Sequence, residues 1–178
     1  MKTMTKIVAT ALTAVAIFIG TTNVQAQTND KSAWRLGFGL EGGLPTGKIK
    51  DYTSFQLGGT ARLQYGLADN LALTLTSGYY NYFGKDVTQS GVTFKNDDIG
   101  IIPVKLGIKS FFTDNLYFGA EAGAGFATNE GNNTKLILAP TLGWADKSWD
   151  VGVKYENFSG NNNNWGTVGL RLAYGFSL

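Results

Sequence analysis

The sequence contains no histidine and no cysteine among its 178 residues. Without cysteine there is neither a disulfide framework nor a lipid-carrying cysteine behind an N-terminal signal. Catalytic dyads and triads with an imidazole base are excluded, as is thiol chemistry. Asp97 and Asp98 are adjacent at an expected strand end, so their side chains would point to opposite faces. We therefore expect no catalytic residue and no enzyme activity.

An excess of charge of one sign is also missing. The chain has 15 Lys plus Arg against 13 Asp plus Glu, and Lys2 and Lys6 belong to a segment that we expect to be removed. The remaining balance gives no sign of a nucleic-acid partner. The acidic residues of the expected loops lack the D-x-[DN]-x-[DN]-G spacing of a calcium loop. We expect neither a metal site nor a cofactor.

Proline is scarce, at 3 residues, and no long stretch after residue 30 keeps apolar residues at helical spacing. Glycine, at 24 residues, and aromatic residues, at 13%, are abundant. This composition favours a β-rich protein with close backbone approaches and almost no helix.

The N-terminus has the pattern of a secretory signal peptide. Lys2 and Lys6 precede the apolar run "IVATALTAVAIFI", and small residues follow at "NVQA". The run of 13 residues is shorter than the roughly 20 that a membrane-spanning helix needs. We expect residues 1–26 to be cleaved as a signal peptide, with 27–32 left as a short periplasmic lead.

Strict alternation of apolar and polar residues dominates the rest of the chain. Period two is the signature of a strand with two unlike faces. Eight segments show it: 34–40, 55–65, 71–79, 102–112, 116–126, 135–144, 149–156 and 167–176. The sequence predicts eight strands.

Short and long connections alternate between these segments. "ADN" at 68–70, "TDN" at 113–115 and "ADKS" at 145–148 are short, and we expect Asn70 and Asn115 to end hairpin loops at positive φ. The other connections, 44–54, 81–98, 127–134 and 157–164, are longer and rich in Gly, Asn, Asp and Lys. One end of the structure should be tight and the other should carry long loops.

Alternation alone leaves two arrangements, a lipocalin-like barrel with its apolar face inside and a membrane barrel with that face outside. The alternation of short turns and long loops favours the membrane barrel. So does the glycine-rich polar face, because small residues leave room for charged ones in a narrow lumen. Aromatic residues at both ends of the apolar stripes suit two interfacial girdles. They are Trp34, Tyr65, Phe112, Phe118, Trp144, Trp149 and Phe176 at the turn end, and Phe55, Tyr79, Phe126 and Tyr155 at the loop end.

A signal peptide, eight alternating segments, "IPVKLGIKSFF" before a short turn and a last strand "VGLRLAYGFSL" resemble the outer membrane protein beta-barrel domain family. That family is similar to small eight-stranded OmpA/OmpX-type barrels. The resemblance covers residues 33–178 and implies an all-β, antiparallel, up-and-down transmembrane barrel with short periplasmic turns and longer extracellular loops. It also implies recognition by the barrel assembly machinery, which usually reads a terminal aromatic residue; here Phe176 lies two places before the end.

Charged residues on the inward face should pair, because single charges are costly to bury in a narrow lumen. The candidates are Arg35, Glu41, Arg62, Lys105, Lys109, Glu121, Asp150, Lys154, Glu156 and Arg171. Hairpin register places Glu121 across from Gly107, so we expect Glu121 to bridge Lys105 and Lys109. The charges either plug the lumen or line an ion path; eight strands favour the plug. An aromatic group, Tyr79, Tyr80, Tyr82 and Phe83, is either an adhesive cluster or a girdle with Tyr80 in the lumen.

The sequence thus predicts a monomeric, non-enzymatic barrel, residues 33–178, in the outer membrane of a Gram-negative-type cell. Its expected role is to support the envelope or to bind a surface partner through its loops, a partner that the sequence does not identify. Outer-membrane lipid is the other expected partner. The alternatives are a narrow pore or carrier for small solutes or lipids, and a soluble lipocalin-like binder of a hydrophobic ligand.

Overall fold

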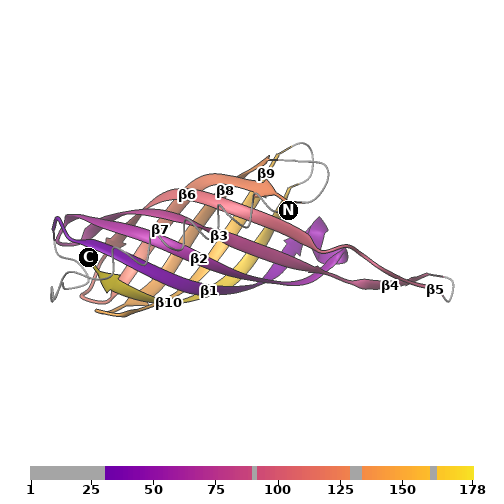
Figure 1. The fold of residues 1–178 in the computed structure, drawn as a ribbon, viewed down its shortest axis with the longest axis horizontal. Coiled ribbons are helices and arrows are strands. Elements are labelled where there is room, and N and C mark those ends of the chain that lie inside the picture. Colours follow the sequence, from indigo (N-terminus) through magenta and orange to yellow (C-terminus); the bar gives the residue numbers. More distant parts are fainter. Residues whose placement is uncertain (1–30, 90–91, 129–133, 161–163) are drawn as a thin grey trace, which may run out of the picture.

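The computed structural model describes residues 31–89, 92–128, 134–160 and 164–178, most of which form one closed antiparallel barrel (Figure 1). The barrel strands are β1 (Trp34–Gly47), β2 (Thr53–Ala68), β3 (Leu71–Gly84), β6 (Ile99–Phe111), β7 (Leu116–Ala127), β8 (Thr134–Ala145), β9 (Trp149–Ser159) and β10 (Trp165–Ser177). Their order around the barrel is β1-β10-β9-β8-β7-β6-β3-β2. The predicted eight-stranded, up-and-down antiparallel barrel is confirmed.

The predicted signal peptide, 1–26, and residues 27–30 of the predicted lead lie outside the described residues. A short 3-10 helix, η1 (Lys48–Asp51), joins β1 to β2. No helix in the described part of the chain is long and apolar enough to cross a membrane.

The strands are longer than the sequence pattern predicts. They run from 11 residues in β9 to 16 in β2, whereas a tilted membrane-spanning strand needs about 9–11. The additional residues lie mainly at the end with the long connections, where alternation gives way to polar residues and glycine. The barrel wall therefore continues past the apolar band at that end.

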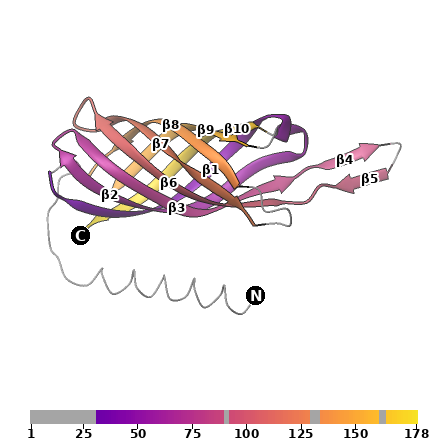
Figure 2. The same ribbon diagram turned by 90° about the horizontal axis from the view of Figure 1, so that it is seen from above.

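Two further strands occupy the connection 81–98, which the sequence analysis treated wholly as a loop. β4 (Asp86–Gln89) and β5 (Val92–Lys95) pair with each other and continue the β3 and β6 ribbon far beyond the barrel (Figures 1 and 2). Each strand has only four residues, too few for period two to stand out. The base of this hairpin is fixed by Asp98, which accepts hydrogen bonds from Asn81 Nδ2 and Gly84 N, both at 3.0 Å.

The tight turns do not use the predicted left-handed asparagines. Among the described residues the only non-glycine residue with positive φ is Ser32, so the prediction for Asn70 and Asn115 is wrong. A register irregularity between Gly66 and Ala68 reshapes the β2–β3 connection. Side chains cap the other two turns. Thr113 Oγ1 accepts from Leu116 N at 2.9 Å, and Asp146 Oδ1 accepts from the backbone amides of the β8–β9 turn. Bulges and side-chain caps are alternative ways to close a hairpin.

The apolar face lies outside. Leu73 and Val104 are each 41% exposed and Leu170 is 60% exposed, whereas Lys105 is fully buried in the lumen. The interior of a lipocalin-like barrel would show the opposite pattern. The predicted girdle aromatics also lie on the exterior, with Trp34 and Tyr65 in ring contact at 4.7 Å. The barrel thus presents an apolar belt with aromatic residues at both ends.

The β8–β9 turn yields a pH prediction. The amides of Trp149 and Ser148 donate to the Asp146 carboxylate at 2.7 and 2.8 Å, and these bonds lower its pKa. A lowered folded-state pKa stabilises the protein above the unfolded pKa, about 3.9, and this contribution is lost as the pH falls through the folded pKa. Asp146→Ala should lower the free energy of unfolding by about 1 kcal/mol at pH 7.

Urea titrations of the refolded barrel in detergent micelles, at pH 7 and pH 3, measure this effect. The stability difference between the wild type and Asp146→Asn, whose amide oxygen can still accept but carries no charge, should shrink as the pH falls. A difference that stays constant between the two pH values would contradict the role given to the carboxylate.

Candidate functional site

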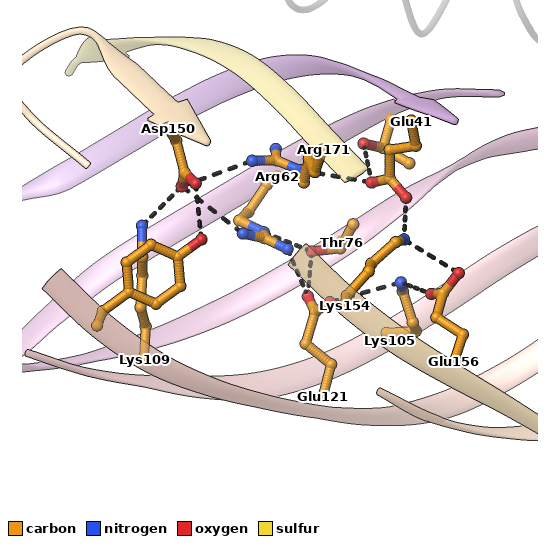
Figure 3. A network of polar contacts seen from close by, with 12 residues as sticks. Glu41, Arg62, Thr76, Lys105, Lys109, Glu121, Asp150, Lys154, Glu156 and Arg171 are labelled. Carbon is orange, nitrogen blue, oxygen red and sulfur yellow. Dashed lines mark hydrogen bonds and ion pairs between the residues drawn. The ribbon is translucent and has the colours of Figure 1, made fainter. Parts of the chain in front are cut away.

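The lumen holds a connected set of charged side chains, which we call the lumen network (Figure 3). Its members come from β1, β2, β6, β7, β9 and β10. They are Glu41, Arg62, Lys105, Lys109, Glu121, Asp150, Lys154, Glu156 and Arg171. Every member is at most 7% exposed. An unpaired charge at this depth would cost several kcal/mol. The barrel can therefore bury these side chains only because they pair with one another.

The part nearest the long loops is centred on Tyr80. Lys105 Nζ and Lys154 Nζ each donate to its hydroxyl oxygen at 3.1 Å, and the hydroxyl donates to Glu41 Oε2 at 2.8 Å. Lys154 also pairs with Glu41 and with Glu156. Tyr80 therefore faces the lumen, as the girdle alternative expected, and its hydroxyl connects two lysines to two carboxylates. Tyr82, which that alternative left in the girdle, is buried in the lumen as well, so this part of the alternative is wrong.

The centre of the network is built on Glu121. The β6–β7 register pairs Glu121 with Gly107, as the hairpin analysis predicted. Glu121 contacts Arg62 Nη2 at 3.1 Å and Lys105 Nζ at 3.4 Å, and it accepts a hydrogen bond from Thr76 at 2.6 Å. Lys109 pairs with Asp150 instead, at 2.6 Å, so the expected Glu121–Lys109 bridge is wrong.

The part nearest the short turns is centred on Asp150. Its Oδ2 lies 2.6 Å from Lys109, 3.5 Å from Arg171 and 3.8 Å from Arg62, while Tyr117 donates to Oδ1 at 2.7 Å. One carboxylate thus faces three cations that come from three different strands. Direct side-by-side pairing within a hairpin cannot produce this arrangement, because β9 is not a neighbour of β2 or β6.

Arg35 stands apart from the network. Its Nη1 donates to the backbone carbonyl of Asp146 at 2.8 Å, and no carboxylate of the described residues lies within ion-pair distance. The guanidinium of Arg35 lies directly against Gly175, in space that a side chain at that position would fill.

Apolar layers lie above and below the charges, and sequence reasoning missed them. At the loop end Tyr82, Phe158 and Trp165 meet ring to ring, with Phe158 and Trp165 stacked at 5.4 Å. At the turn end Phe111 packs on Tyr117 at 5.5 Å. All five are buried. Phe111 and Tyr117 already have lumen parity within the predicted segments 102–112 and 116–126, and extending the alternation of the other strands by two or three residues would have placed Tyr82, Phe158 and Trp165 inside.

Glycines provide the space for these large side chains. Gly58 pairs with Tyr80, and a Cβ at that glycine would lie 2.5 Å from the tyrosine ring. A Cβ at Gly107 would lie 2.6 Å from Cγ of Glu121. Both distances are too short for non-bonded atoms. The missing side chains of these glycines therefore leave the space that Tyr80 and Glu121 occupy.

These features define a class: a small eight-stranded barrel of the outer-membrane type, with an apolar belt outside and a filled, charged lumen. No protein-family model and no curated protein matches the chain. Solved structures do match in fold. Ail, the attachment invasion locus protein of Yersinia pestis, aligns with a TM-score of 0.57 at 14% identity, over 83% of this chain and 100% of that one.

Two other structures show the same architecture. The de novo designed barrel TMB2.3 aligns with a TM-score of 0.53 at 19% identity, over 80% of this chain and 94% of its own. OprG from Pseudomonas aeruginosa aligns with a TM-score of 0.50 at 11% identity, over 86% and 99%. At these identities the comparisons establish the fold. A designed barrel among them shows that the fold alone implies no particular function.

The network predicts a large effect of Glu121→Gln. The amide can still accept from Thr76, but Arg62 and Lys105 lose a buried counter-charge. The free energy of unfolding should fall by about 3 kcal/mol, as for other broken buried pairs. Asp97→Asn, which removes one negative charge from the exposed base of the β4–β5 hairpin, is the matched control and should change stability by less than about 0.5 kcal/mol.

Tryptophan fluorescence during urea unfolding in micelles reports both values. Equal stabilities of the two variants would show that the lumen charges are compensated by water and not by each other.

Proposed function

We propose that this protein is an integral outer-membrane barrel that acts as a closed, non-enzymatic platform for surface interaction through its long loops. The observation that carries the proposal is the apolar belt around a lumen filled with paired charges. A protein with this exterior needs lipid around it, because a continuous apolar surface of this extent is unfavourable in water. Residues 1–26 would direct it to the envelope, with the short turns in the periplasm.

The packing of the lumen supports a closed barrel over a pore. The Phe158–Trp165 layer lies at the loop end, the lumen network fills the middle, and the Phe111–Tyr117 layer lies at the turn end. An eight-stranded barrel is barely wide enough for its own side chains. Hydrated ions would have to break several buried ion pairs to pass. The packing therefore favours a closed barrel over the alternative function, a narrow pore or carrier.

The β4–β5 hairpin supports a role at the cell surface. It extends the β3 and β6 ribbon well past the ends of the other barrel strands, as Figure 2 shows from above, and its base is fixed by the Asp98 hydrogen bonds. A projecting two-stranded ribbon has two free edges, which can pair with a strand of a partner. Ail, whose name refers to attachment and invasion, is built on the same fold.

Assembly would end with β10. This strand pairs with β1 along its length and closes the barrel, and Leu178 N donates to Trp34 O at 2.9 Å. Phe176 lies on the exterior of this strand near the turn end. We propose that the barrel assembly machinery reads this last strand through Phe176, and that the assembled barrel is a monomer surrounded by outer-membrane lipid.

Sidedness can be tested with single cysteines, because the native chain has none. Asp97 lies in the long connection after the β4–β5 hairpin, and Asp69 lies in the short β2–β3 turn; both are exposed. In intact cells a membrane-impermeant maleimide should label Asp97→Cys strongly and Asp69→Cys only after the outer membrane is permeabilised.

The cysteine-free wild type sets the background of this experiment. Labelling of Asp69→Cys alone in intact cells would mean that the loops face the periplasm. Equal labelling of both positions in the soluble fraction would mean that the chain is not a membrane barrel. Either result would remove the proposed surface role.

A further inference from the structure

A small cavity near the turn end of the lumen is lined by three arginines and one acidic side chain. The guanidinium groups belong to Arg35, Arg62 and Arg171, and the carboxylate belongs to Asp150. The cavity volume is about 10 Å³, enough for one water-sized atom or group. Three positive groups around so small a space are unusual, because like charges repel strongly where water is scarce.

The cations of this region exceed its carboxylates. Within the lumen network five cations face four carboxylates, and Arg35 adds a sixth cation. Glu41 and Glu156 pair with the lysines nearest the long loops, Lys154 and Lys105. Near the short turns, Asp150 is the carboxylate that pairs with Lys109, and it also contacts Arg62 and Arg171. The uncompensated positive charge therefore lies at the turn end.

Unused hydrogen-bond donors point to the same place. Arg35 Nη2 and both Nε and Nη1 of Arg171 are buried and have no hydrogen-bond partner in the part of the chain that the structure describes. The ion-pair contacts of Arg171, 3.4 Å to Glu41 and 3.5 Å to Asp150, are long for charge-assisted hydrogen bonds, which are typically about 2.7–2.9 Å. Buried donors without partners are costly, and an acceptor in the cavity would satisfy them.

We propose that this cavity is a binding site for a small monovalent anion, with chloride as the chemical type. A negative charge there would compensate part of the excess and accept from the arginine donors, and its single-atom size matches the available volume. Arg35 is partly exposed at the turn end, which gives the ion an entry path from that side. The site would hold the turn end of the barrel together as a fixed counter-ion and would need no transport through the lumen.

The test compares unfolding of the refolded wild-type barrel in detergent micelles in sodium chloride and in sodium gluconate at equal ionic strength. Chloride should raise the urea midpoint in a saturable way. At a chloride concentration ten times the Kd, the folded-to-unfolded ratio should rise about tenfold. Arg35→Gln should remove this dependence, whereas Lys147→Gln, which removes an exposed charge from the neighbouring β8–β9 turn, should keep it.

Equal midpoints in chloride and gluconate would overturn the proposal. So would a chloride effect that persists in Arg35→Gln, or one that is lost in both variants, because neither result depends on the arginine-lined cavity. Crystals grown in bromide give a second readout that does not depend on stability. An anomalous peak beside Arg35, Arg62 and Arg171 is expected, and water alone at that position would reject the site.

Discussion

Charge compensation inside a narrow barrel is the constraint on which this structure depends. Each carboxylate of the lumen network contacts cations from other strands: Asp150 on β9 meets Lys109, Arg62 and Arg171 of β6, β2 and β10. A slip of one residue in any of these strands would turn its charges toward the apolar exterior. The ion pairs therefore specify register and also compensate most of the buried charge, although the net stabilisation from each buried pair is small.

The filled lumen also determines where function can lie. With charges paired in the middle and aromatic layers at both ends, the described side chains fill most of the lumen, and the cavity beside Arg35 and Arg171 measures only about 10 Å³. The exterior belt is occupied by lipid if the barrel lies in a membrane. The proposed surface role therefore belongs to the loop end, where β3 and β6 rise beyond the belt into the β4–β5 hairpin. The structure thus combines a barrel with a packed, largely ion-paired lumen and a projecting ribbon.

Period-two alternation was sufficient to predict eight strands, their apolar face and the pairing of Glu121 with Gly107, because each follows from counting residues along a hairpin. It was not sufficient to pair Lys109 with Asp150, because that contact crosses the lumen and depends on how the closed barrel brings β6 opposite β9. The buried positions of Phe158 and Trp165 could have been predicted by extending the strand parity. Strands β4 and β5 have four residues each, too few for period-two alternation to indicate a strand.

Ion conductance across planar lipid bilayers tests whether the packed, largely ion-paired lumen closes the barrel. The refolded sample should first show faster electrophoretic mobility unboiled than boiled, which verifies that a folded barrel is being measured. The account predicts that this folded protein inserts without discrete conductance steps. Reproducible single-channel steps from the same heat-modifiable band would contradict it, and would show that the paired charges line an ion path.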